Sequence, residues 1–282
     1  MVIKVVRLGK RIRPPRIKIV KAGGAQTTAN RQITKSASVL LGVALVILSF
    51  VLGMDVIQDR ADIAAVQAAA VAGSPPILLD AGHGGEDGGT VAVDGTAEKG
   101  INLAIAKKLE NYLRAFGYQV TMTRENDTAT YTPGTKTLRA KKTSDLHNRM
   151  AMMDALGPNA IFVSIHQNHY PAESLHGCQV FYSRNTENSK TLAQRIQNSV
   201  VSQIQQTNKR LVKPAGTEIY LLYEAKIPAV MVECGFLSNW EETGLLKSDG
   251  YQNQIAYAIA CGILDYTSGT TKEQAPVPAE LP

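Results

Sequence analysis

Short hydrophobic runs alternate with longer amphipathic stretches between residues 77 and 266. The short runs are rich in β-branched and aromatic residues and are bounded by turn-forming residues, a pattern typical of β-strands. They cover residues 77–79, 118–123, 160–166, 178–183, 217–222 and 228–233. We therefore expect a sheet of about six strands.

The longer stretches carry hydrophobic residues at the three- and four-residue spacing of a helix. This spacing predicts helices over residues 102–116 and 144–156, and two more that carry the stripes 192/196/200/204 and 255/259/263. Strands that alternate with helices predict an α/β fold with a mixed, mostly parallel sheet and helices on both faces. The polar stretch 123–142 is predicted to be a loop, and a long loop in a compact domain is often functional.

A different pattern precedes this domain. Residues 36–54 are uncharged and largely apolar. As a helix rising about 1.5 Å per residue, they reach roughly across the ~30 Å hydrocarbon core of a bilayer. We predict a single transmembrane anchor here. A cleaved signal peptide and a buried helix of a soluble core are the alternatives.

The charge of the chain is divided unevenly. The whole sequence has 30 Lys and Arg against 24 Asp and Glu, but ten of the basic residues lie in residues 1–35, which contain no acidic residue. Basic residues before the apolar segment place the N-terminus in the cytoplasm by the positive-inside rule. We therefore predict a basic cytoplasmic arm (1–35), an anchor (36–54), a linker (55–76) and an extracytoplasmic domain (77–266) of a single-pass protein of the cell membrane.

Three further expectations concern partners, the C-terminus and the cysteines. Topology and anionic lipid head groups account for the basic arm, so we expect no nucleic-acid partner. Residues 267–282 are polar and contain proline, which predicts a disordered tail. The cysteines are Cys178, Cys234 and Cys261, with no Cys-x-x-Cys spacing. They indicate no disulfide framework or structural zinc, and we expect Cys178 and Cys261 to be buried thiols.

The first predicted strand runs directly into the turn Asp80-Ala-Gly-His-Gly-Gly85. Glycines on both sides of His83 let the backbone approach a ligand closely. Histidine is a metal ligand or a proton carrier near neutral pH. A Gly-rich turn with one surface histidine is the simpler interpretation of this stretch taken alone.

Two other predicted strands end in residues with related chemistry, His166 and Glu233. If the strands are parallel, these side chains and His83 emerge at the same edge of the sheet, where α/β proteins bind ligands. Glu98 lies just before a predicted helix, where it either complements the helix dipole or joins the two histidines. Two histidines and a carboxylate are a common ligand set of catalytic zinc, which keeps a fourth position for water. A separate carboxylate must then move protons, and Glu233 is the candidate.

Other polar residues are candidates for supporting roles. Asp80 is expected to orient His83, because metal-bound imidazoles usually need an acceptor. Asn168, two residues after His166, is a further candidate for orienting the site or binding substrate. Arg149 either anchors its helix by a salt bridge or binds a substrate carboxylate.

The remaining histidines have weaker claims. We expect His147 on a surface and His176 in a loop. His169 follows His166 closely and is a candidate for lining a substrate groove.

Four segments together resemble the zinc-dependent N-acetylmuramoyl-L-alanine amidases of the bacterial cell wall. They are residues 80–85, Glu98 before a helix, residues 164–168 and residues 232–239, and the resemblance covers about residues 77–266. It implies one Zn²⁺ bound by His83, Glu98 and His166, with Glu233 as the catalytic carboxylate. It also implies peptidoglycan as the substrate, cleaved at the amide between the muramic lactyl group and L-alanine. Ala81 stands where the family usually has proline, which loosens the turn but removes no chemistry.

The single anchor, the absence of a wall-binding repeat and residues 220–239 are most similar to the germination-specific amidases of spore formers. Those enzymes help to make the muramic lactam of spore cortex. A general wall-remodelling amidase, a zinc peptidase acting on wall peptides and a non-catalytic wall-binding protein are the alternatives. The sequence does not identify a protein activator.

Overall fold

The structure is a computed structural model that describes residues 73–273 of the chain, with side chains up to residue 269. The predicted basic arm, the anchor and most of the linker lie outside these residues. Within residues 73–273, no helix combines the length and the hydropathy needed to cross a membrane.

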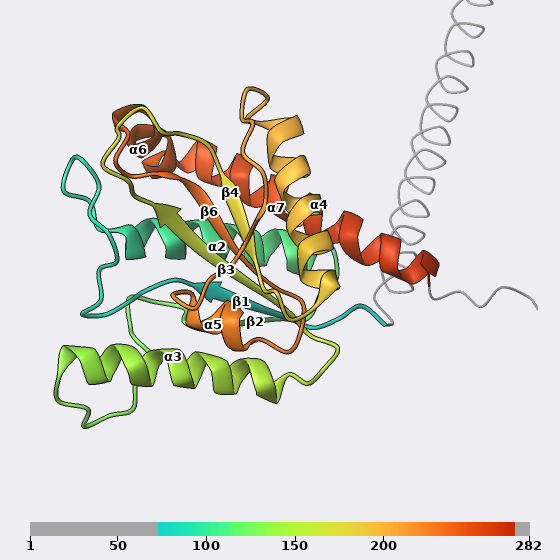
Figure 1. The fold of residues 1–282 in the computed structure, drawn as a ribbon, viewed down its shortest axis with the longest axis horizontal. Coiled ribbons are helices and arrows are strands. Elements are labelled where there is room, and N and C mark those ends of the chain that lie inside the picture. Colours follow the sequence, from blue (N-terminus) through green and yellow to red (C-terminus); the bar gives the residue numbers. More distant parts are fainter. Residues whose placement is uncertain (1–72, 274–282) are drawn as a thin grey trace, which may run out of the picture. The chain divides into compact units, whose positions relative to one another are not determined.

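Six strands form one sheet in the order β2-β1-β3-β6-β4-β5 (Figure 1). The strands are β1 (Ile77–Ala81), β2 (Val120–Met122), β3 (Ile161–Asn168), β4 (Gln179–Tyr182), β5 (Lys213–Pro214) and β6 (Ala229–Phe236). Neighbours pair in parallel except β4 and β6, which are antiparallel. The predicted mixed, mostly parallel sheet of six strands is confirmed.

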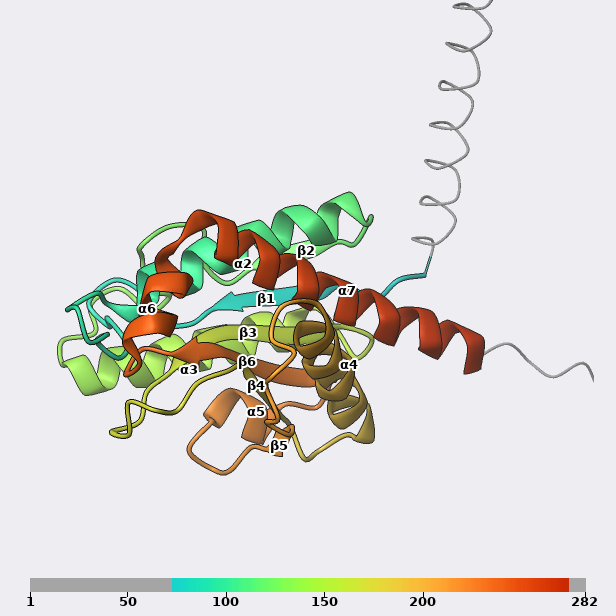
Figure 2. The same ribbon diagram turned by 90° about the horizontal axis from the view of Figure 1, so that it is seen from above.

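Helices cover both faces of the sheet (Figure 2). One face carries α2 (Glu98–Ala115), α4 (Glu187–Gln203) and α7 (Asp249–Glu273), and the other carries α3 (Leu138–Ala155) and the short α5 (Tyr220–Glu224). The helix α6 (Trp240–Lys247) follows β6. Because the central strands are covered on both sides, all five residues of β1 are buried, as is usual in parallel sheets.

The prediction of a strand over residues 217–222 is wrong. The chain forms only the two-residue strand β5 before this stretch, and residues 220–224 are the helix α5. Leu221 and Leu222 are both buried in the core under α3. A short apolar run does not distinguish a strand from a buried helical turn, and here packing on the sheet face selects the helix.

Three predicted boundaries are also wrong. The helix α2 begins at Glu98, four residues before the predicted start at residue 102. The helix α3 begins at Leu138, six residues earlier than expected, because the Thr137 side chain caps it by accepting from the Ala140 amide. The loop before it is correspondingly shorter. At the C-terminus, α7 continues to Glu273, so the first part of the predicted tail is helical, and a hydrogen bond between Tyr118 and Thr267 (2.5 Å) ties it to the domain. Residues 274–282 lie outside the described part.

The cysteines are all free thiols in the described structure. Cys178 is buried, as predicted, and so is Cys234. The prediction that Cys261 is buried is wrong: it is only half-buried in α7, where it interacts with the exposed Tyr257 one turn earlier.

Candidate metal centre

The turn after β1 holds His83 in an unusual backbone conformation. Its φ of +62° lies in the left-handed region, which non-glycine residues seldom adopt. Two buried arginines fix this turn through its carbonyl oxygens. Arg124 donates to Ala81 (2.8 Å) and to Gly82 (2.9 Å), and Arg149 donates to Ala81 (3.0 Å) and to His83 (2.8 Å). Three successive carbonyls are thereby paired, and the side chain of His83 is held in one place.

The imidazole of His83 lies between two carboxylates. Its Nδ1 is 2.9 Å from Asp87 Oδ2, and its Nε2 is 3.2 Å from Glu98 Oε2. A carboxylate on the outer nitrogen is the usual partner of a metal-bound histidine, because it fixes the tautomer and the ring orientation. Nε2 is thus the nitrogen directed into the site.

Glu98 is the first residue of α2 and is only 3% exposed. Its Oε2 accepts from the Thr90 amide (2.9 Å), and its Oε1 accepts from the Gln167 amide (3.0 Å). At Gly89 a Cβ atom would come within 2.6 Å of Glu98 Oε2, so the chain needs glycine there for the carboxylate to fit.

His166 lies in β3 and completes the group. Its Nδ1 is 3.0 Å from Glu98 Oε1, and its ring packs edge-on against that of His83 with centroids 4.8 Å apart. A Cβ atom on Gly82 would lie 2.1 Å from His166 Nε2. The absence of a side chain at Gly82 therefore gives the imidazole its place.

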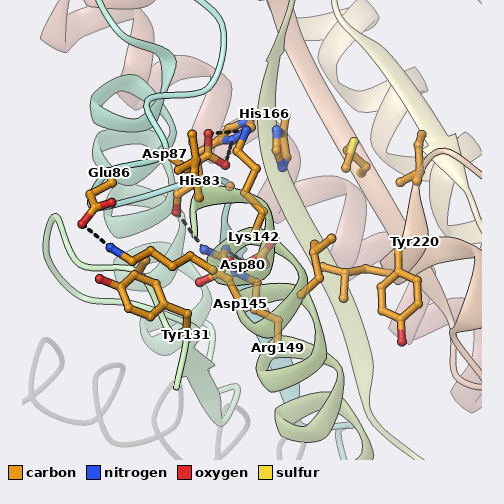
Figure 3. Close-up of a pocket in the computed structure, with 18 of the residues that line it drawn as sticks. Asp80, His83, Glu86, Asp87, Tyr131, Lys142, Asp145, Arg149, His166 and Tyr220 are labelled. Carbon is orange, nitrogen blue, oxygen red and sulfur yellow. Dashed lines mark hydrogen bonds and ion pairs between the residues drawn. The ribbon is translucent and has the colours of Figure 1, made fainter. Parts of the chain in front are cut away.

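One potential ligand atom from each of His83, Glu98 and His166 lies within 4.8 Å of the others. Figure 3 shows the two imidazoles close together beside the cavity. It is the one such cluster among residues 73–269. Two imidazoles and a carboxylate are a donor set that zinc prefers, and three protein ligands leave a position for water or substrate. The residues present therefore fit a zinc ion.

The imidazoles and carboxylates of this group are electrostatically coupled. Burial would raise the pKa of Glu98, but the two histidines hold it well below its usual range. Burial lowers the pKa of His83, whereas its bonds to Asp87 and Glu98 outweigh that effect and raise it to about 9. Each partner thus stabilises the charge of the other, which indicates a site built for opposite charges in contact.

Glu233 lies opposite His166 in the register of β6 and β3. Its Oε2 is buried without a hydrogen-bond partner in the described part of the chain. Burial raises the pKa of Glu233 to about 7, with His166 acting to lower it and Glu98 to raise it. An unpaired buried carboxyl oxygen is rare, and a group that titrates near pH 7 is suited to proton transfer.

The expectation that Asp80 orients His83 is wrong. The carboxylate of Asp80 accepts instead from Thr123 (2.7 Å), Ser164 (2.6 Å) and Arg149. Asp87 orients the ring of His83. Asp87 lies four residues after His83 in the same Gly-rich turn, which made it a candidate partner for the imidazole. The sequence alone did not show which of the nearby carboxylates contacts His83.

Arg149 anchors its helix rather than reaching out to substrate. It is 2% exposed, and its donors bind Asp80, Asp145 and the turn after β1. The role predicted for Asn168 stays a prediction; its carbonyl accepts from the Leu237 amide at the end of β3.

The other histidines lie outside the donor group. His147, His169 and His176 are all exposed, and the surface position predicted for His147 is confirmed.

A cavity of about 280 Å³ opens beside His83 and His166, between the turn after β1, α3 and α5 (Figure 3). Its walls are mostly apolar and include Leu146, Leu221 and Met231. Two ion pairs join α3 to the Gly-rich turn at this cavity, Lys141–Glu86 (2.6 Å) and Lys142–Asp87 (2.9 Å). A ligand in this cavity would lie next to the donor group.

The chain is similar to several known proteins over this whole domain. The family model described as N-acetylmuramoyl-L-alanine amidase matches residues 77–265. The germination-specific N-acetylmuramoyl-L-alanine amidase of Bacillus subtilis (strain 168) is 35% identical over 190 residues, which are 67% of this chain and 78% of that protein.

Solved structures agree with this match. The CwlD amidase of Clostridioides difficile, solved in complex with the GerS lipoprotein, is 43% identical with a TM-score of 0.66, over 70% of this chain and 100% of that one. The amidase AmiC2 of Nostoc punctiforme is 30% identical with a TM-score of 0.59, over 70% and 99% of the two chains. The chain therefore belongs to the N-acetylmuramoyl-L-alanine amidase family.

Proposed function

We propose that this amidase is zinc-dependent and hydrolyses the bond between the lactyl group of N-acetylmuramic acid and L-alanine in peptidoglycan. One observation carries the proposal: three potential metal-ligand atoms lie within 4.8 Å of one another, and the unpaired carboxyl oxygen of Glu233 lies on the strand next to His166. This is the arrangement that metal-assisted hydrolysis requires, with a ligand set and a separate proton carrier.

His83, Glu98 and His166 would hold the zinc ion. When bound, zinc supplies polarisation of the amide carbonyl and a lowered pKa for water. Asp87 keeps the ring of His83 in the orientation that directs Nε2 into the site. The two buried arginines hold the turn that carries His83, so that the ligands need little reorganisation.

Glu233 performs the proton transfers. Its carboxylate accepts a proton from water as the water oxygen bonds to the amide carbon. It then delivers that proton to the nitrogen of L-alanine as the carbon–nitrogen bond breaks. A pKa of about 7 suits both steps, because the group accepts and releases a proton at neutral pH.

The experiment that tests the proposal is digestion of purified peptidoglycan followed by mass spectrometry. Wild-type protein with zinc should release stem peptides that begin with L-alanine, and a chelator should abolish release. Glu233→Gln should retain zinc but lose about 10²–10⁴-fold in rate, the usual contribution of a general acid–base residue. Wild-type rates in this variant would disprove the role of Glu233, and undiminished rates after zinc removal would disprove the metal dependence.

We also propose a role in spore cortex, supported by the similarity to the germination-specific amidase of Bacillus subtilis. The same digestion discriminates the substrates when cortex-type and vegetative peptidoglycan are compared. Faster release from cortex-type material is expected. Equal rates would favour a general wall-remodelling amidase.

For localisation we propose that residues 36–54 anchor the enzyme in the cell membrane, with the catalytic domain outside. The uncharged length of this segment and the basic residues before it support the proposal. Full-length protein should fractionate with membranes and be open to external protease in protoplasts, whereas residues 55–282 alone should be soluble. A full-length chain in the soluble fraction would contradict the anchor.

A further inference from the structure

Asn102 is a fully buried amide located one helical turn after Glu98 in α2. Its Nδ2 donates to Glu98 Oε1 (3.0 Å) and to the Gly82 carbonyl (3.2 Å). Its Oδ1 accepts from Gln167 Nε2 (3.2 Å). Each end of the amide has a partner, so the orientation of the side chain is fixed by its surroundings.

These partners come from the three segments that carry the candidate metal ligands. Gly82 precedes His83 in the turn after β1, Glu98 opens α2, and Gln167 follows His166 in β3. The backbone N–H of Gln167 also donates to Glu98 Oε1, the oxygen that accepts from Asn102. The three segments are far apart in sequence, and this buried side chain bonds to all of them.

The chemistry of the donors is suited to a metal ligand. Apart from the two imidazoles of the candidate site, the groups that donate to Glu98 are the backbone amides of Thr90 and Gln167 and the side chain of Asn102, which are all neutral. A lysine or arginine in the same place would compensate the carboxylate charge and compete with a cation. Neutral donors fix the direction of the carboxylate and leave its charge for the metal.

We propose that Asn102 is a positioning residue for the metal centre. It orients Glu98 and keeps the three ligand-bearing segments in register, and its loss weakens metal binding more than it weakens folding. The inference rests on the proposed zinc dependence. The fold has other support at this point, because Arg124 still holds the Gly82 carbonyl and the Gln167 amide still holds Glu98 when Asn102 is replaced.

The test compares two buried amides. Asn102→Leu is nearly isosteric and removes all three hydrogen bonds. The matched control is Asn208→Leu, because Asn208 is 8% exposed and also has bonded side-chain atoms at both ends, donating to Cys178 O (2.8 Å) and accepting from Arg210 N (2.9 Å). Zinc affinity of the full chain is measured by competition with a chelating indicator, together with the melting temperature of the metal-free protein and the visible spectrum of the cobalt-substituted form.

Asn102→Leu should weaken zinc binding about 10- to 100-fold, the usual effect of losing a group that orients a metal ligand, and should shift the cobalt spectrum. Asn208→Leu should lower the melting temperature without either change. Equal zinc affinities for the two variants would overturn the inference. If Asn102→Leu does not fold, Asn102→Ala is tested in its place. If neither Asn102 variant folds while Asn208→Leu does, Asn102 is needed for folding itself and the inference is overturned. A wild-type chain that binds no zinc would refute the proposed function and this inference together.

Discussion

At the scale of single residues, the candidate metal centre depends on two glycines as much as on its ligands. The imidazole of His166 occupies the space where a side chain of Gly82 would lie, and Glu98 and His83 occupy that of Gly89. The ligands reach their positions because these two residues have no Cβ. A Cβ atom on Gly82 would lie 2.1 Å from an imidazole nitrogen, and it cannot be accommodated unless the ring of His166 moves.

Gly82→Ala is therefore expected to displace His166 and weaken zinc binding at least tenfold, with a matching loss of peptidoglycan hydrolysis at limiting zinc. The matched control is Gly88→Ala in the same turn, where the nearest atom would be Ala97 Cβ at 3.7 Å, an ordinary contact. Zinc titration of both variants measures the difference. Similar affinities for the two would show that the close approach at Gly82 does not matter.

Three of the principal site residues, His83, His166 and Glu233, could be predicted from the sequence because the carboxyl ends of parallel strands meet at one edge of the sheet. The adjacency of β1, β3 and β6 brings them together. Glu98 opens the helix α2 and was a candidate only as the carboxylate that joins the two histidines. Asp87 and Asn102 could not be assigned in the same way. Their roles depend on how a turn folds back and on which side chains face one another inside the core, and neither leaves a periodic signal.

At the scale of elements, the pair α4 and α7 is packed closely at one point. A Cβ atom on Gly262 of α7 would lie 2.6 Å from Ile196 Cα and 2.9 Å from the Arg195 carbonyl oxygen of α4. Both are backbone atoms, which cannot turn aside as a flexible side chain does. Gly262 thus sets how near the two helices approach on this face of the sheet.

Gly262→Ala should destabilise the protein by about 1–3 kcal/mol, the usual range for overpacking, because the helices must separate. Gly250→Ala in the first turn of α7 has nothing within 4 Å of its Cβ and should change stability by less than about 1 kcal/mol. Urea denaturation of the metal-free forms measures both. An unchanged free energy of unfolding for Gly262→Ala would mean that α7 can move away from α4 without loss of stability.

The helices that carry long apolar stripes were predictable, since their period persists over several turns. The errors fall where that signal is weak. The first turn of α3 is mostly exposed and carries one large apolar residue, Leu138, so its start at a threonine cap had no apolar period to mark it. The helix α5 spans five residues, too few for a period to emerge.

At the scale of the whole molecule, a buried ion pair joins the sheet to α3. Asp80 and Arg149 are 1% and 2% exposed, and Arg149 also holds the turn that carries His83. Burial alone would raise the pKa of Asp80, but Arg149 and the hydroxyl donors lower it from 3.8 to about 2. The charged form of Asp80 is thus the one that the folded state stabilises.

A carboxyl group whose pKa is lower in the folded state stabilises the fold above its unfolded pKa, and this contribution is lost as the pH falls through the folded pKa. For Asp80 the window is about pH 4 to 2, and the contribution is about 2 kcal/mol. Asp80→Asn should be less stable at pH 5, because Arg149 loses its buried partner, and should show a shallower loss of stability between pH 4 and 2. Denaturation of both metal-free proteins measures the slopes. Equal slopes of stability against pH in the two proteins would show that Asp80 does not contribute to the loss of stability in acid.

The place of β6 in the sheet has a consequence for the order of events during synthesis. It is the last strand along the chain, yet it lies between β3 and β4. A nascent chain can contain His83, Glu98 and His166 long before Glu233 is made, but its sheet then lacks an interior strand. The strand that completes the sheet is also the one that carries Glu233, the proposed proton carrier. We therefore expect a chain that ends before β6 to have no hydrolytic activity. Under the role proposed for Glu233, the amidase acquires activity only when its sheet is complete.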